Sequence, residues 1–337
     1  MKLHDLLPPG RMPTMIAIRS LLLTATLFLA PACSSCSGNA RATRDADPTF
    51  PDGAPSDWGS ATAPDKVPYT GAFPAGKGAL AATLTVASVA RKVELYLPAS
   101  LAKGAPLLIT LHGTNDDALR MINASGAKDL ADQEDLVVAS PWGRQISSGD
   151  WDNHGGNERY WRTYPETDPN QNPDLLLVRA IITEARRAYS IDPRRVYLLG
   201  HSNGGFFAIT AAMALPRQIA AFAANSSGLV RCATTAGCTF KGTATSCDGL
   251  AAQQGWCSCG GAEKPVAMPV SGRRVPGFIS HSVDDPTVSV YYSCQLAARM
   301  KALGFAVELR LFTGEGHGMP YPLAINAYSF MKKWIAN

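Results

Sequence analysis

The chain has 337 residues, of which 46% are hydrophobic, and a formal net charge of +4 at pH 7. This length and apolar content allow one large globular domain with a substantial core. The small net charge gives no electrostatic reason to expect a nucleic acid or an anionic membrane surface as a partner.

The amino-terminal region has the pattern of an export signal. An apolar run from Leu21 to Ala32 follows Arg19 and ends in small residues before Cys33. The run is shorter than the roughly 20 residues that a membrane span needs. We therefore interpret residues 1–33 as a signal peptide and expect an exported protein. Cys33 also stands where a degenerate bacterial lipobox would carry a lipid, so secretion and anchoring through Cys33 both stay open.

Residues 34–70 are rich in Ala, Pro, Gly, Ser and Asp and have no apolar periodicity, which predicts a disordered linker. Further on, short apolar runs alternate with amphipathic stretches of helical length. Strands are expected at 83–86, 93–97, 106–111, 136–140, 195–199, 219–224, 275–280 and 306–312. Helices are expected at 116–131, 175–189, 204–215, 289–303 and 323–335. This alternation predicts one α/β domain over 71–337, with a mostly parallel sheet covered by helices on both faces.

Two long segments interrupt the alternation. Residues 142–173 contain Trp142, Trp151 and Trp161, which are candidates for substrate binding, although they could equally pack the loop onto the sheet. Residues 229–270 form a cysteine-rich insertion, for which we expect an ordered cap or lid.

Six cysteines lie beyond the amino-terminal region, namely Cys232, Cys238, Cys247, Cys257, Cys259 and Cys294. An even number in an exported chain favours disulfides, whose pairing the sequence leaves open. A zinc site is disfavoured because the paired Cys-x-x-Cys spacing is missing. No metal is therefore expected.

The run Gly200-His201-Ser202-Asn203-Gly204 stands between an expected strand and an expected helix. This is the context of a nucleophile elbow, in which a sharp turn exposes the serine hydroxyl and the glycines avoid a clash across it. Ser202 is therefore the candidate nucleophile. The N–H of Asn203 and the N–H of Thr114, in the turn after strand 106–111, are the candidate oxyanion donors. The alternative for that turn is that Gly113 merely makes it tight.

A serine nucleophile needs a base and an orienting acid, in the chain order Ser, Asp or Glu, His. His317 lies in a glycine-rich loop after the last expected strand, and Asp284 and Asp285 follow the strand before it. His112 and His201 are expected to be structural. His281 precedes the acid loop, where its backbone is expected to matter more than its ring.

These motifs resemble the polyhydroxybutyrate depolymerase and feruloyl esterase group of exported α/β-hydrolases, which includes bacterial lipoproteins. The resemblance rests on Leu111-His112-Gly113, on 191–197, on the Gly-His-Ser-Asn-Gly-Gly elbow and on 281–288. The acid segment of the family reads His-Gly-x-x-Asp-x-x-Val, so its alignment selects Asp285 over Asp284. Ser282 replaces the usual Gly there, which keeps the choice open.

The resemblance implies ester hydrolysis through an acyl-enzyme, without a metal or an organic cofactor. The expected substrates are feruloyl- or acetyl-type plant esters or a polyester, so the partner could be a polymer. A peptidase of the same fold is the enzymatic alternative. A surface binding protein on an inactive hydrolase scaffold is the alternative from another class.

Overall fold

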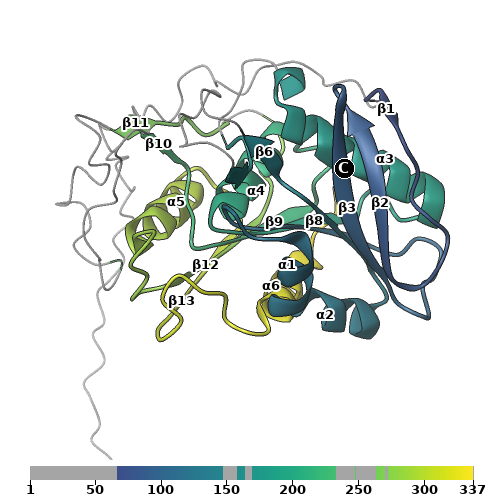
Figure 1. Ribbon diagram of the computed structural model, residues 1–337. Helices are drawn as coiled ribbons and strands as arrows, with labels where there is room; N and C mark the ends of the chain where they lie inside the picture. Colours follow the sequence, from purple (N-terminus) through teal and green to yellow (C-terminus); the bar gives the residue numbers. More distant parts are fainter. Residues whose placement is uncertain are drawn as a thin grey trace, which may run out of the picture. The chain divides into compact units, whose positions relative to one another are not determined.

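The computed structural model describes residues 67–146, 158–163, 169–232, 247, 263–269 and 272–336 (Figure 1). The expected signal peptide, Cys33 and the linker up to residue 66 lie outside these residues. Residues 67–70 belong to the fold instead, because Val67 is buried and β1 (Tyr69–Thr70) pairs with the following strand. The predicted end of the linker at residue 70 is therefore too late.

Nine strands of the described chain form one sheet, in the spatial order β1-β2-β3-β5-β4-β8-β9-β12-β13. After β1 their bounds are β2 (Gly78–Val86), β3 (Val89–Leu97), β4 (Leu107–Leu111), β5 (Val137–Pro141), β8 (Val196–His201), β9 (Ala221–Asn225), β12 (Gly277–Ser282) and β13 (Val307–Phe312). The six strands from β5 to β13 are parallel, whereas β1, β2 and β3 are joined antiparallel at one side. The carboxyl ends of the parallel strands therefore meet at one edge.

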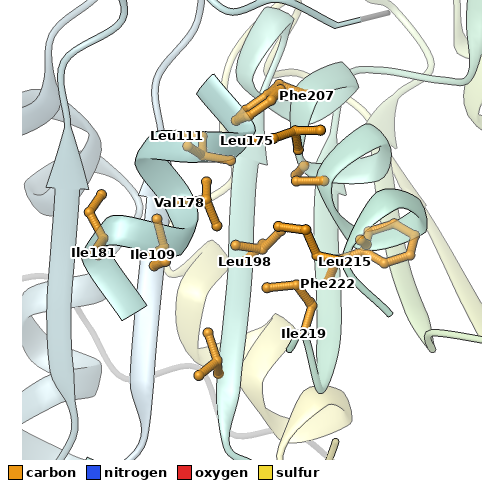
Figure 2. Packing of buried hydrophobic residues seen from close by; sticks show 14 of the residues in the cluster. Ile109, Leu111, Leu175, Val178, Ile181, Leu198, Phe207, Leu215, Ile219 and Phe222 are labelled. Atoms are coloured by element: carbon orange, nitrogen blue, oxygen red, sulfur yellow. The ribbon is translucent and has the colours of Figure 1, made fainter. Parts of the chain in front are cut away.

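Helices cover both faces of this sheet. The helices α3 (Pro173–Tyr189), α4 (Asn203–Ala214) and α5 (Val290–Ala302) share one apolar cluster, which includes Ile109 and Leu111 of the central strand (Figure 2). The helices α1 (Ala118–Ala124), α2 (Ala127–Glu134) and α6 (Leu323–Met331) share the other cluster, which includes Leu108. Successive residues of a strand point to opposite faces, so the apolar run 106–111 supplies both clusters. The predicted α/β architecture is confirmed.

The structure departs from the predicted elements where local conformation changes within a few residues. The helix expected at 116–131 is divided into α1 and α2 at Gly126, which adopts a left-handed φ of 77°. The hairpin of β6 (Arg144–Ile146) with β7 (Glu158–Tyr160) and the antiparallel pair of β10 (Val230–Cys232) with β11 (Glu263–Pro265) lie in the two interruptions. The first interruption also contains the short helix η1 (Pro169–Gln171). Strands of three residues are too short to show a periodicity in the sequence. Within the described ranges, no helix has both the length and the apolar character to cross a membrane.

Candidate active site

Ser202 occupies the sharp turn between β8 and α4, with backbone angles φ 53° and ψ −127°. Its N–H donates to the carbonyl of Asn225 at 2.9 Å, which holds this strained conformation. A Cβ atom at Gly200 would lie 2.1 Å from the Gly204 carbonyl oxygen, and one at Gly204 would lie 2.2 Å from the Leu111 carbonyl oxygen. Both flanking positions therefore require glycine. The turn leaves Ser202 partly exposed at the carboxyl edge of the sheet.

His317 connects Ser202 to a carboxylate. Its Nε2 lies 2.9 Å from Oγ of Ser202, and its Nδ1 lies 2.7 Å from Oδ2 of Asp285. His317 lies in the loop after β13 and Asp285 in the loop after β12, so two neighbouring strand ends supply them. A carboxylate at Nδ1 favours the tautomer whose Nε2 can accept the Ser202 proton. The three residues therefore have the geometry that activates a hydroxyl as a nucleophile.

The Asp285 carboxylate is buried and held by several donors. Its Oδ1 accepts the N–H groups of Thr287 at 2.8 Å and Val288 at 2.9 Å, and its Oδ2 lies 3.2 Å from Nε2 of His281. Burial alone would raise the pKa of Asp285, but hydrogen bonds from His281, His317 and the Val288 N–H outweigh it and hold this pKa well below its ordinary value. Asp285 therefore stays ionised. The ring of His281, for which the sequence favoured a role mainly through the backbone, therefore also reaches the acid.

Asp284, the other candidate acid, makes different contacts. Its carboxylate accepts the hydroxyl of Ser282, and both of its oxygens lie 3.1 Å from the N–H of Gly314. The pKa of Asp284 is lowered, chiefly by the Ser282 hydroxyl. The structure thus brings Asp285, and not Asp284, to His317. Asp284 instead ties the end of β12 to the start of the loop that carries His317.

The turn after β4 lies against the serine. A Cβ atom at Gly113 would stand 3.2 Å from the Cβ of Ser202. Within the described chain, the N–H groups of Thr114 and Asn203 donate to no backbone or side-chain acceptor. Asn203 is the first residue of α4, where an N–H has no partner inside the helix. Both N–H groups therefore lack an acceptor among the described residues, and they belong to the residue after Ser202 and to the turn that lies against it.

Two further histidines adjoin the site. His112 is buried, and each of its ring nitrogens forms a hydrogen bond with a backbone group. His201 packs its ring 5.0 Å from the ring of His317, and its Nδ1 lies 2.7 Å from Oδ1 of Asn225. Burial, assisted by the charge that His317 can carry, lowers the pKa of His201 to about 4. His201 is therefore neutral at neutral pH. These contacts agree with the structural role expected for both rings.

The three tryptophan candidates for substrate binding differ in their surroundings. Trp151 lies outside the described residues. Trp161 is fully buried and stacks on Phe207 with ring centroids 5.4 Å apart, so its prediction as a substrate contact is wrong and the packing alternative applies. The reason is that Trp161, directly after β7, packs against Phe207 of α4 and donates to the His112 carbonyl in the turn after β4. Trp142 is partly exposed, and its indole N–H donates to Glu94 at 2.9 Å. Of the three, only Trp142 is described and has accessible surface.

A disulfide between Cys247 and Cys294 attaches the cysteine-rich insertion to α5. Cys232 lies in β10, whereas Cys238, Cys257 and Cys259 lie outside the described residues. Among the residues that the structure describes, no group of three or more His, Cys, Asp or Glu side chains is arranged to hold a metal ion.

Comparison with known proteins places this site in a family. The family model described as the prolyl oligopeptidase family matches residues 152–337, which contain Ser202, Asp285 and His317. A bifunctional acetylxylan esterase/xylanase from Neocallimastix patriciarum is 35% identical over 133 residues, covering 40% of this chain and 17% of that protein. A poly(3-hydroxyalkanoate) depolymerase C from Paucimonas lemoignei is 29% identical over 140 residues, covering 42% of this chain and 32% of that protein.

A solved structure of a ferulic acid esterase matches with a TM-score of 0.52 at 14% identity, covering 79% of this chain and 97% of that one. This similarity supports the fold. The chain spans less than a third of the length of each of the two named sequence relatives. The sequence match to a poly(3-hydroxyalkanoate) depolymerase agrees with the resemblance to the polyhydroxybutyrate depolymerase and feruloyl esterase group, and the match to a ferulic acid esterase shows the same fold. The chain belongs to the prolyl oligopeptidase family of α/β-hydrolases, and its named relatives are carboxylic ester hydrolases.

Proposed function

We propose that the protein is a serine esterase in which Ser202 is the nucleophile, His317 the general base and acid, and Asp285 the orienting acid. The N–H groups of Thr114 and Asn203 form its oxyanion hole. The observation that carries this proposal is the hydrogen-bonded series from Asp285 through His317 to Ser202, with distances of 2.7 Å and 2.9 Å. Nucleophile, base and acid within hydrogen-bond reach of one another are the requirement for acyl transfer.

The reaction proceeds by two displacements. Oγ of Ser202 bonds to the ester carbonyl carbon, its proton passes to Nε2 of His317, and the carbonyl π electrons form an oxyanion held by the two N–H groups. Collapse of this intermediate breaks the bond to the alcohol oxygen, which takes the proton from His317. Water then repeats the sequence on the acyl-enzyme and releases the acid. Asp285 stabilises the imidazolium in both halves, and the chemistry requires no metal or organic cofactor.

The named relatives support a carboxylic ester as the substrate class. An acetylxylan esterase and a poly(3-hydroxyalkanoate) depolymerase share sequence with this chain. We therefore favour acetyl- or feruloyl-type esters of plant polymers, or a polyhydroxyalkanoate-type polyester. Trp142 is the proposed aromatic contact for the substrate. The apolar run before Cys33 supports export, either by secretion or with a lipid anchor on Cys33.

A peptidase is the second candidate, because the matching family is described by a prolyl oligopeptidase. The same serine, histidine and aspartate would cleave a peptide bond by the same steps. The ester relatives make this candidate the weaker of the two. A non-catalytic binding protein is disfavoured, since none of the three residues that acyl transfer needs is missing.

The deciding experiment is hydrolysis of p-nitrophenyl acetate, p-nitrophenyl butyrate, methyl ferulate, acetylated xylan, a polyhydroxybutyrate film and a proline-containing peptide substrate. Wild type should cleave at least one ester, and Ser202→Ala should lose at least about a thousandfold in kcat. Ester hydrolysis that survives in Ser202→Ala would refute the mechanism. Cleavage of the peptide alone would favour a peptidase, and cleavage of none would favour a binding protein.

A further inference from the structure

Trp161 joins the two segments that carry the candidate oxyanion donors. Its backbone N–H donates to Oδ1 of Asn203 at 2.8 Å, and Nδ2 of Asn203 lies 3.3 Å from the Trp161 carbonyl oxygen. Its indole N–H donates to the carbonyl of His112 at 2.8 Å. One residue thus holds both the start of α4 and the turn after β4. The donors themselves, the N–H groups of Thr114 and Asn203, lie within two residues of these contacts.

The position of the Trp161 indole is itself fixed. The ring is fully buried, and it lies nearly parallel to the ring of Phe207 at an interplanar angle of 6°. The guanidinium of Arg91 lies 5.6 Å from the ring centroid, and Arg91 is in turn bonded to the buried Asp174 at 2.7 Å. A planar ring packed between these groups cannot rotate without opening the core. Its N–H is therefore held in one direction.

The hairpin β6–β7, which leads into Trp161, holds the same turn at two more points. Asn115 and Arg159 exchange two hydrogen bonds, from the N–H of Asn115 to the Arg159 carbonyl and from the N–H of Arg159 to Oδ1 of Asn115, each 3.0 Å long. The N–H of Gly143, just before β6, donates to Nε2 of His112 at 2.8 Å.

That last contact fixes the tautomer of His112. Because Nε2 accepts a hydrogen bond, Nδ1 carries the proton and donates it to the Gly113 carbonyl at 2.7 Å. The Gly113 carbonyl and the Thr114 N–H belong to one planar trans peptide and point in opposite directions. Holding the carbonyl therefore also holds the direction of the Thr114 N–H.

From these contacts we propose that Trp161 is a positioning residue, which sets the separation and direction of the two oxyanion donors through Asn203 and His112. The inference rests on the proposed function, because it concerns the oxyanion hole of the same site. Donors that are fixed before reaction stabilise the developing charge without reorganisation, so loosening them lowers the rate more than it weakens substrate binding. Of the aromatic segment 142–173, Trp161 is therefore assigned a role in the packing that supports the site, whereas Trp142 stays the proposed substrate contact.

The test compares Trp161→Phe with Trp334→Phe as a matched control. Phe keeps an aromatic ring at position 161 but removes the N–H that reaches His112. The indole N–H of Trp334 has no hydrogen-bond partner in the described chain, so its loss should leave activity unchanged. The kcat and KM for p-nitrophenyl acetate are measured per active site titrated with a fluorophosphonate. The inhibition constant of an aryl trifluoromethyl ketone, which forms an oxyanion on Ser202, is measured in parallel.

Trp161→Phe should lose about tenfold in kcat, with KM within about twofold, and should bind the ketone about tenfold more weakly. Asn115→Gly removes a second attachment of the hairpin without touching the core, and should change kcat and ketone binding in the same direction. Kinetics like those of Trp334→Phe in both variants would overturn the inference. So would a rise in KM alone. Wild type inactive on every ester would instead overturn the proposed function, and this inference with it.

Discussion

Nε2 of His281 lies 3.2 Å from Oδ2 of Asp285, the same oxygen that lies 2.7 Å from Nδ1 of His317. Both rings therefore face the same carboxylate oxygen. His281 approaches it from the buried interior, and His317 approaches it from the candidate site. His281 is buried, and its Nε2 also lies 2.8 Å from the Val288 carbonyl oxygen. Because a carbonyl only accepts, this nitrogen carries a proton and can donate to Asp285 as well.

Because Asp285 contacts His317 and Asp284 does not, substitution of each aspartate should have a different effect on activity. Asp285→Asn should lower kcat for p-nitrophenyl acetate by about a thousandfold or more, since His317 loses the carboxylate that orients and stabilises it. Asp284→Asn is the matched control, and it should cost less than about tenfold because Asp284 contacts Ser282 and Gly314 rather than His317. A larger loss in Asp284→Asn than in Asp285→Asn would show that the acid has been assigned wrongly.

His281→Gln should lower kcat by about tenfold while KM stays within about twofold, because Asp285 loses one of several donors and is held less firmly. His281 acts through Asp285, so its replacement should have little further effect in an Asp285→Asn background. Steady-state kinetics of the two single variants and the double variant measure this coupling. Additive losses would contradict a role exerted through the carboxylate.

The depressed pKa of His201 predicts a dependence of stability on pH. The folded protein holds this pKa at about 4, whereas an unfolded histidine has its pKa near 6.5. The unfolded chain therefore binds more protons between these values. The stability linked to His201 is complete above about pH 6.5 and is lost as the pH falls toward 4, with a magnitude on the order of 3 kcal/mol.

Urea unfolding of wild type and His201→Gln between pH 4 and pH 7 measures this linkage. Gln does not titrate, so the free energy of unfolding should fall less steeply toward pH 4 in the variant. The ionisation of Asp285 does not interfere, because its lowered pKa confines its linkage chiefly to pH values below about 4 and because wild type and variant share it. Equal slopes for the two proteins would argue against a buried neutral His201.

The buried ion pair between Arg91 and Asp174 should be important for stability. Its atoms are 2.7 Å apart, and the two side chains are 4% and 0% exposed. Arg91→Met should lower the free energy of unfolding by about 3 to 5 kcal/mol, because it leaves the Asp174 carboxylate buried without its cation. The exposed pair of Arg194 and Asp192 provides the control, and Arg194→Met should cost less than about 1 kcal/mol. Similar losses in both variants would contradict this account.

Removal of the disulfide should destabilise the fold by about 2 to 4 kcal/mol, since the bond closes a loop across a sequence separation of 47 residues. Cys247→Ser and Cys294→Ser break the same bond, so they should lower the unfolding midpoint by similar amounts under non-reducing conditions. Peptide mapping of unreduced wild type should yield a linked pair of peptides that contain Cys247 and Cys294. Finding either cysteine free or joined elsewhere would contradict the pairing.

Much of the fold was predictable because its signals are local in the sequence. Strand 106–111 is apolar at nearly every position, and the structure places Leu107 to Leu111 at the buried centre of the sheet. The helix expected at 116–131 is broken at Gly126, whose left-handed φ of 77° no periodicity of apolar residues reveals. The hairpin β6–β7 was missed because each of its strands has three residues.

For the site, the sequence by itself determined the elbow around Ser202, because Gly-x-Ser-x-Gly between a strand and a helix permits few conformations. It also determined that a histidine and an aspartate should follow on successive strand ends. Only the tertiary structure decided that Asp285 rather than Asp284 contacts His317, that the ring of His281 contacts Asp285, and that Trp161 is buried. Those outcomes depend on contacts between segments far apart in the chain. A local pattern of residue types does not specify which side chain of a loop points into the domain.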